Sequence, residues 1–287
     1  MSNMVVRTNV LAINSHRSLK QVGAQQAKSS ARLSSGYKVN SAADDAAGLA
    51  ISEKMRAQIR GLDQASSNAQ DAISLIQTAE GGMQEIDNML QRIRELTVKA
   101  ANDTLDADGT TGDRLKVQDE IQQLATEIDS MSERVEFNKK KIINGSFSAT
   151  ALHFQVGANA SQSMTLTIGK LDMATLSSTL NTFITGGSMA TAVGASISDV
   201  IANVDDAIEK VTTERSKLGA AQNRLEYTMK SLDISSENLS ASESRIRDTD
   251  MAKEMMALTQ ANVLQQAATS MLAQANQAPQ SVLQLLQ

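Results

Sequence analysis

Apolar residues recur every three or four positions along most of the chain, a pattern typical of helices that pack side by side. The clearest stripe of this kind consists of Leu62, Ala65, Ala69, Ala72, Ile76, Ala79, Met83, Ile86, Leu90 and Ile93. Its register extends back to Ile51, so it covers about 50 residues, or roughly 75 Å of helix. The glycines at 81–82 do not shift the register. We therefore expect one continuous helix that begins at a capping box formed by Ser41 and Asp44.

Two further stripes follow a loop rich in Asp, Thr and Gly at 102–113. The second stripe consists of Val117, Ile121, Leu124, Ile128, Met131 and Val135. The third consists of Ile197, Ile201, Val204, Ile208, Val211, Leu218, Leu225, Met229, Leu232, Leu239 and Ile246, with the polar residues Arg215, Gln222, Ser236 and Glu243 at intervening positions. Polar residues in such a stripe lower stability but fix the register. The short loop predicts that the first two helices are antiparallel neighbours.

Between the second and third stripes the apolar period changes from about 3.5 to two. Leu152, Phe154 and Val156 alternate with other residues, and so do Met164, Leu166 and Ile168. This alternation predicts a β-hairpin near 152–169, with its turn within 157–163. Residues 170–196 show no period, and the sequence predicts no element there.

The two ends of the chain carry weaker stripes. Near the amino end, apolar residues recur at intervals of seven and eleven and include Val5, Leu11, Leu19, Val22 and Leu33. The carboxyl-terminal stripe is mostly alanine and consists of Ala257, Ala261, Leu264, Ala268, Met271, Ala275, Ala278, Val282 and Leu285. Its complete burial would contribute roughly 13 kcal/mol, whereas ordering about 30 backbone residues costs about 1–2 kcal/mol each. We therefore expect these helices to need neighbours.

Together these patterns predict a mainly α protein. We expect an elongated antiparallel helical bundle or coiled coil with a small β-hairpin, plus terminal helices that pair on assembly. Contacts between such incomplete ends do not close on themselves, and open contacts of this kind produce filaments.

Composition excludes several classes of protein. The chain has four Phe and two Tyr, no Cys and no Trp, so it is not a disulfide scaffold, and its core must be aliphatic. A net charge of −5 gives no reason to expect a nucleic-acid partner. No apolar run is long enough to insert into a membrane. Residues 1–16 lack the features of a cleaved signal peptide.

No combination of residues predicts catalysis, a cofactor or a metal site. The carboxylates Asp103, Asp106, Asp108 and Asp113 lack the spacing of a calcium-binding loop. The two histidines, His16 and His153, are far apart in sequence, and no phosphate-binding glycine loop is present. The lysines at 139–141 are expected to form a solvated turn. The sequence therefore favours a structural protein over an enzyme.

Six segments resemble bacterial flagellin, in the order in which that family has them. They are 33–52 (LSSGYKVNSAADDAAGLAIS), 90–102 (LQRIRELTVKAAN), 154–169 (FQVGANASQSMTLTIG), 218–225 (LGAAQNRL), 244–255 (SRIRDTDMAKEM) and 272–286 (LAQANQAPQSVLQLL). The resemblance covers essentially the whole chain. It implies a self-polymerising subunit of the flagellar filament that serves motility.

The resemblance also implies a domain organisation. Residues 1–44 and 250–287 would form an inner coiled-coil domain that is disordered in the free subunit, and 45–249 an outer helical domain. Only the hairpin and 170–196 lie between the two halves, so the chain is similar to a minimal flagellin without large variable outer domains. Its location would be the extracellular filament, reached through the flagellar type III export apparatus without a cleaved signal peptide. An export chaperone, the filament cap and hook-junction proteins would be its partners.

The family resemblance implies one further partner, Toll-like receptor 5 of a vertebrate host. The matching receptor-binding residues are Arg92, Leu96 and Glu120. Arg92 and Leu96 are four residues apart, so we expect them to share a helix face beside the first stripe. That face would be accessible in the free subunit and covered in the filament.

Two alternatives remain open at this point. A hook-filament junction protein would share the terminal helices but would not form long filaments. A soluble coiled-coil signalling module would have ordered termini in the isolated chain and would not be secreted.

Overall fold

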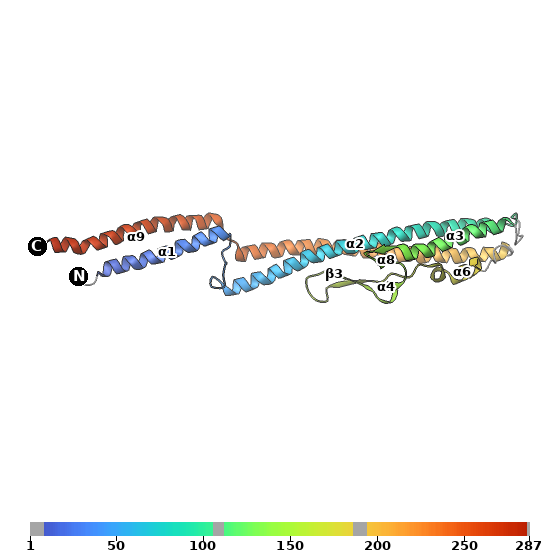
Figure 1. Ribbon diagram of the computed structural model, residues 1–287, viewed down its shortest axis with the longest axis horizontal. Coiled ribbons are helices and arrows are strands. Elements are labelled where there is room, and N and C mark those ends of the chain that lie inside the picture. The colour runs from blue at the N-terminus through green and yellow to red at the C-terminus, as the bar shows by residue number, and fades with distance from the viewer. Residues whose placement is uncertain (1–8, 106–111, 186–193, 286–287) are drawn as a thin grey trace. The chain divides into compact units, whose positions relative to one another are not determined.

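The computed structural model describes residues 9–105, 112–185 and 194–285. The chain is mainly helical with small β-hairpins, which confirms the predicted class (Figure 1). Its contacts divide it into two compact units, one of residues 1–59 with 237–287 and the other of residues 60–236. The sequence-based division at 44/45 and 249/250 stays a prediction.

Three helices supply the core of unit 60–236. They are α2 (Ala46–Ala100), α3 (Asp113–Arg134) and α8 (Gly194–Arg247), the first and last of which also extend into the other unit. The first stripe is confirmed, because its members from Ala65 to Ile93 are at most 1 % exposed. As predicted, α2 continues through the glycines at 81–82. Val117, Ile121 and Ile128 of α3 belong to the same buried cluster as Val204, Val211 and Leu225 of α8.

Side-chain pairs show that α2 runs antiparallel to both partners. Arg92 of α2 binds Glu120 of α3, and Val135 at the carboxyl end of α3 lies beside Gly82, earlier on α2. Arg94 of α2 binds Asp205 of α8 at 2.6 Å, and Ser66 near the other end of α2 donates to Asp233 at 3.2 Å. The predicted antiparallel arrangement of the first two helices is therefore correct.

One predicted polar position of the third stripe meets a buried partner. Arg215 Nη1 lies 3.6 Å from Asp87 Oδ2, and Arg215 Nη2 lies 3.9 Å from Glu80 Oε1. Asp87 is 7 % exposed and also accepts a hydrogen bond from Gln91 at 3.2 Å. Because this ion pair needs both partners at the same level of the bundle, it favours one alignment of α2 with α8.

The predicted hairpin is present as β3 (Leu152–Gln155) and β4 (Ser163–Leu166), with Leu152 opposite Leu166. A second, shorter hairpin that the sequence did not predict consists of β1 (Glu136–Phe137) and β2 (Lys140–Lys141). Its turn places Asn138 and Lys139 at φ 50° and 63°. The lysines at 139–141 are exposed, as expected, although two of them belong to a strand.

Three short helices complete the unit: α4 (Ser146–Ala149), α5 (Met173–Leu176) and α6 (Ser178–Thr185). Asp172 caps α5 by accepting a hydrogen bond from the Thr175 amide at 3.0 Å. Met173 and Leu176 are buried, which holds this aperiodic segment against the helices. Residues 186–193 lie outside the described part of the chain.

The unit of residues 1–59 and 237–287 contains the two terminal helices, α1 (Val10–Ser35) and α9 (Met251–Leu285), which we call the terminal pair. They lie side by side and antiparallel (Figure 1). Asn9 Nδ2 donates to the Ala275 carbonyl at 2.6 Å, and Gln26 Nε2 donates to Asn262 Oδ1 at 2.8 Å. The structure forms this pair within one chain. That neighbouring copies complete it stays a prediction.

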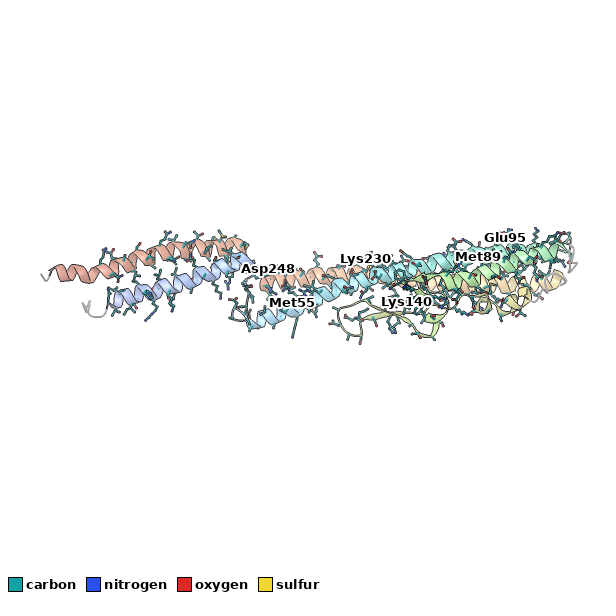
Figure 2. The ribbon with its side chains drawn as sticks, in the orientation of Figure 1. Met55, Met89, Glu95, Lys140, Lys230 and Asp248 are labelled. Atoms are coloured by element: carbon teal, nitrogen blue, oxygen red, sulfur yellow. The ribbon has the colours of Figure 1, made fainter. Side chains whose placement is uncertain are left out.

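The segments that follow α1 and precede α9 are bonded to each other. Gly36 ends α1 in the left-handed conformation at φ 75°, and its carbonyl accepts a hydrogen bond from Thr249 at 2.9 Å. The backbone of Tyr37 forms a β-bridge with Asp248, which Figure 2 labels. The Arg247 guanidinium lies over the Tyr37 ring, 4.7 Å from its centre. Arg247 also binds Glu53 at 2.6 Å. Backbone hydrogen bonds and charged contacts therefore hold these two segments together.

The start of α2 differs from the prediction. Asp45 caps the helix by accepting a hydrogen bond from the Gly48 amide at 2.9 Å, so the predicted capping box at Ser41 and Asp44 is wrong. Asp44 instead accepts hydrogen bonds from Ser41 in the preceding turn and a salt bridge from Lys28 at 2.9 Å. The Lys28 ammonium is the main cause that lowers the pKa of Asp44 to about 2.

Gly82 and Gly81 should respond oppositely to alanine. A Cβ on Gly82 would lie 2.7 Å from a methyl of Val135 and 2.9 Å from Ile143, whereas one on Gly81 would meet nothing within 4 Å. We expect Gly82→Ala to lower the free energy of unfolding by about 1–3 kcal/mol through overpacking. Gly81→Ala should raise it by about 0.5–1 kcal/mol through helix propensity. Urea unfolding of both variants measures the difference, and equal effects would contradict the close packing.

Asp44 should make the unit of the terminal pair sensitive to acid. Because its folded pKa, about 2, lies below the ordinary 3.8, its contribution to stability is present above pH 3.8 and is lost as the pH falls through 2. Thermal unfolding between pH 2 and 5 should show a flatter pH dependence in Asp44→Asn than in the parent chain. Lys28→Met, which removes the partner, should flatten it similarly. If both variants show the same pH dependence of thermal unfolding as the parent chain, the ion pair does not contribute to stability.

Candidate assembly surface

The contact between α1 and α9 contains few large apolar side chains. Partly or fully buried positions of α1 recur every three or four residues at Ala12, Ser15, Leu19, Val22, Gln26, Ser29 and Leu33. Only Ser29 among the described residues of α1 is fully buried. In the described part of α9, the buried apolar residues are Ala261 and Ala275. Serine and alanine let the helices approach but remove little apolar surface from water.

Large apolar side chains lie instead on the outer faces of the terminal pair. Nine such residues are between 46 % and 68 % exposed: Val10, Leu11, Ile13, Met251, Met255, Met256, Val263, Leu264 and Met271. In Figure 2, side chains project outward along both helices of the pair. We call these nine residues the outer apolar set. Their number on two helices makes the terminal pair a candidate interaction surface.

The predicted residues of the terminal stripes separate into two groups. Leu19, Val22 and Leu33 are half-buried, as expected of residues that face a partner helix. Leu11 is exposed and belongs to the outer apolar set. Val5 lies outside the described residues, and so do the side chains of Val282 and Leu285.

Leu264 and Met271 of the predicted stripe are exposed in the single chain, and their contact with neighbouring copies stays a prediction. The partly or fully buried positions of α9 recur at Glu254, Leu258, Ala261, Gln265, Ala268, Leu272 and Ala275. The alanines belong to both the predicted and the observed stripe. The inward positions between them are shifted by one residue, or about 100° around the helix. Leu264 and Met271 therefore flank the contact with α1.

The face of α9 opposite α1 carries a second part of the outer apolar set. Met256 and Val263 are seven residues apart, so they lie on the same face about two turns apart. Val263 is two residues from the buried Ala261, which places it about 200° around the helix. The terminal pair thus offers apolar contacts in more than one direction.

The three residues matched to receptor binding lie in unit 60–236, and two of them bind each other. Arg92 donates to Glu120 Oε1 from Nη2 at 2.9 Å and from Nε at 3.2 Å, and it donates to Glu95 at 2.9 Å. These hydrogen bonds, with Glu120 first, raise the pKa of the Arg92 guanidinium above its ordinary value. The side chains of Arg92 and Glu120 are about half exposed. They form an accessible charged pair that joins α2 to α3.

Leu96 does not lie beside the first stripe, as the sequence analysis expected, but within the buried core at 3 % exposure. The reason is helical geometry. Four residues advance a helix by about 400°, so Leu96 is rotated about 40° from Arg92, toward the side on which Ile93 is buried. That rotation is enough to separate an exposed arginine from a buried leucine.

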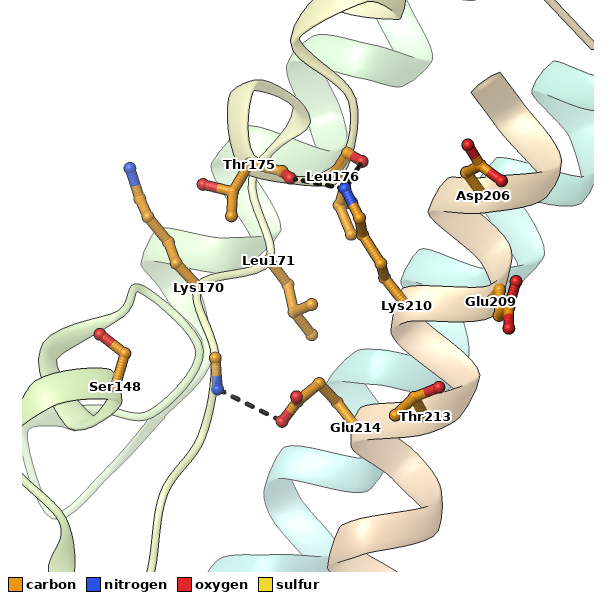
Figure 3. A pocket seen from close by; sticks show the side chains of 11 residues that line it. Ser148, Lys170, Leu171, Thr175, Leu176, Asp206, Glu209, Lys210, Thr213 and Glu214 are labelled. Carbon is orange, nitrogen blue, oxygen red and sulfur yellow. Dashed lines mark hydrogen bonds between the residues drawn. The ribbon is translucent and has the colours of Figure 1, made fainter. Parts of the chain in front are cut away.

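Figure 3 shows an open hollow of about 730 Å³ between α8 and the segment that contains α5. Lys210 crosses it and donates to the carbonyls of Thr175 at 3.2 Å and Leu176 at 2.6 Å. Glu214 accepts a hydrogen bond from the Gly169 amide at 3.4 Å and binds Lys217 at 2.6 Å. These side chains fasten the segment to the helix, which is a structural role.

Among the described residues, no group of three or more His, Cys, Asp or Glu is placed to hold a metal ion. Asp103 binds Arg114 at 2.7 Å, and Asp106 and Asp108 lie outside the described residues. Within the same described ranges, no helix has both the length and the apolar character needed to cross a membrane.

Comparison with known proteins identifies both halves of the chain. Residues 6–148 match the family model of the bacterial flagellin N-terminal helical region, and residues 201–286 match that of the C-terminal helical region. The chain is 48 % identical over 284 residues to a flagellin of Halalkalibacterium halodurans and 45 % identical over 305 residues to a flagellin of Bacillus subtilis. Each alignment covers 99 % of this chain and 100 % of the relative.

A solved structure from Vibrio parahaemolyticus, described as that of a flagellar hook-associated protein, has a similar fold with a TM-score of 0.60 at 14 % identity. It covers 71 % of this chain and 100 % of its own. Identity this low shows the fold alone, whereas the family matches and the full-length relatives are far more specific. The chain belongs to the bacterial flagellin family, whose members are structural subunits of the flagellar filament and not enzymes.

Proposed function

We propose that this flagellin polymerises by covering the outer apolar set of its terminal pair with neighbouring copies. One observation carries the proposal. The fully buried positions in the described part of the pair hold the small residues Ser29, Ala261 and Ala275, while nine large apolar side chains remain about half exposed. A second copy is the occupant that the family supports, because flagellins polymerise with themselves.

The energies favour several neighbours over one. Covering a half-exposed large apolar side chain contributes roughly 1 kcal/mol, so the nine together contribute on the order of 10 kcal/mol. Association of two molecules costs about 4–15 kcal/mol in lost translational and rotational freedom. A single contact that covers only part of the set is therefore weak. A subunit that enters a lattice touches several copies at once, which explains why growth should need a seed.

The same surface supports the finer assignments of domain and partner. Residues 1–44 and 250–287 would form the inner coiled-coil domain of the filament, and 45–249 the outer helical domain. An export chaperone would cover the exposed apolar residues before the chain passes through the type III apparatus without a cleaved signal peptide. Filament cap and hook-junction proteins would meet the same terminal pair at the ends of the extracellular filament.

A junction protein is the rival within this class, because a hook-associated protein shares the fold. The two functions differ in growth. Purified chain mixed with filament fragments should elongate them if it is a filament subunit, and electron microscopy would show this directly. Binding to fragment ends without elongation would favour the junction role.

Substitution of the outer apolar set should weaken growth without unfolding the chain. We expect the pair of changes Leu264→Gln and Met271→Gln to raise the lowest concentration at which filaments persist by about tenfold or more, because each removes about 1 kcal/mol of burial. Light scattering after seeding measures this concentration. The control variant Leu264→Met with Met271→Leu keeps the apolar volume and should behave like the parent chain.

Circular dichroism should show unchanged helix content in both variants, since these side chains are exposed in the single chain. Parent-like growth of the glutamine variant would contradict the proposed surface.

We also propose that the free subunit is a ligand of Toll-like receptor 5 through the pair Arg92 and Glu120. Their exposed, preformed ion pair supports this role, with Leu96 acting from the core beneath them to fix the local helix position. In the filament, a neighbouring subunit would cover this face.

Arg92 and Arg94 provide a matched test of receptor recognition. Their side chains are 50 % and 48 % exposed, and each binds a carboxylate on another helix. In cells that report receptor activation, Arg92→Ala or Glu120→Ala in the monomer should lower potency by about tenfold or more, the scale of a charged hydrogen bond. Arg94→Ala should lower it much less. Equal losses for Arg92→Ala and Arg94→Ala would contradict the assignment.

A further inference from the structure

Among the described residues, the exposed methionines all lie on one helix. The chain has 14 Met but no Cys and no Trp, so the thioether of Met is its main target for two-electron oxidants. Met83, Met164 and Met173 are buried in unit 60–236. The described methionines that are exposed are Met251, Met255, Met256 and Met271, and all four lie on α9.

These four methionines, which we call the α9 methionines, make up nearly half of the outer apolar set. They are between 48 % and 67 % exposed. Met251 and Met255 are four residues apart and share a face, while Met256 lies on the same face as Val263. Met271 repeats the position of Leu264 one heptad later. Their sulfur atoms therefore occupy several faces of the surface on which assembly depends.

We infer that the α9 methionines are an oxidative modification site of the free subunit, and that peroxide acting there blocks its entry into the filament. This inference rests on the proposed assembly surface. In the reaction, a lone pair of the thioether sulfur attacks one peroxide oxygen and the O–O bond breaks. With hydrogen peroxide, a sulfoxide S–O bond forms and the other oxygen leaves as water. Sulfur is oxidised by two electrons and the peroxide is reduced by two.

The effect on assembly follows from polarity. A sulfoxide oxygen is a hydrogen-bond acceptor that water satisfies in the free chain, where these residues are exposed. Between packed helices it loses that water unless a donor replaces it, and the exposed neighbours Val263 and Leu264 offer none. Each buried sulfoxide should therefore weaken the contact about tenfold. In the filament, covered methionines should resist the same reagent.

The experiment uses the full chain, hydrogen peroxide, peptide mass spectrometry and seeded elongation. Sulfoxide should appear on the α9 methionines before it appears on Met83, Met164 or Met173. Over the same period the elongation rate of the parent chain should fall at least tenfold. A variant with Leu at all four positions (M251L, M255L, M256L and M271L) keeps the apolar surface and should elongate normally after the same treatment.

A matched control carries Leu at four partly buried methionines elsewhere (M55L, M89L, M131L and M229L). It should lose elongation on treatment as the parent does. The inference is overturned if the parent chain carries sulfoxide on the α9 methionines and still elongates at its untreated rate. It is also overturned if buried and α9 methionines oxidise equally fast.

These outcomes are distinct from failure of the proposed function. That function is tested without peroxide, by elongation of the glutamine variant described above. Four single Leu variants, each treated and untreated, replace the fourfold variant if that variant does not elongate before treatment. If none of these single variants protects elongation from peroxide, the result would count against the site.

Discussion

The rest of the structure depends on an imbalance between two kinds of helix contact. In unit 60–236, side chains such as Ile76, Ile86 and Leu90 are fully buried between helices of the same chain. In the described part of the terminal pair, the fully buried positions hold Ser29, Ala261 and Ala275, and the large apolar residues are only half-buried or exposed. One unit therefore completes its own core, while the other leaves much of its apolar surface in water.

Much of this arrangement could be predicted because the main stripe is unambiguous. From Ala65 to Ile93 the apolar residues allow one register, and the structure uses it. In α9 the alanines allow two registers, since Leu264 and Leu258 lie on different sides of the same alanine stripe. Alanine removes too little surface from water to decide between them, and only the structure shows that Leu258 is the more buried of the two in the single chain. Strands of two residues, as in β1 and β2, are too short for alternation to be detected.

The residues matched to receptor binding show a second limit of sequence reasoning. Arg92 and Leu96 are four positions apart, which suggests a common face, yet a rotation of about 40° places one in water and the other in the core. Their different burial separates two effects of substitution. Removal of Leu96 would cost about 2–5 kcal/mol of stability, whereas Arg92 can change without a cavity. A receptor that reads this region thus reads a surface held in place by the fold's own core.

The proposed assembly surface accounts for the methionines on α9. A side chain that must pack against more than one neighbour benefits from an unbranched, flexible thioether, which fills irregular gaps better than Leu or Ile. The same sulfur atom reacts with peroxide. Because it is exposed in the free chain, it is accessible to peroxide as well as to a neighbouring copy. Adaptability and sensitivity to oxidation therefore come from one chemical feature. A leucine-rich surface would avoid oxidation but would fit fewer packings, so the composition of α9 favours adaptable contacts over chemical resistance.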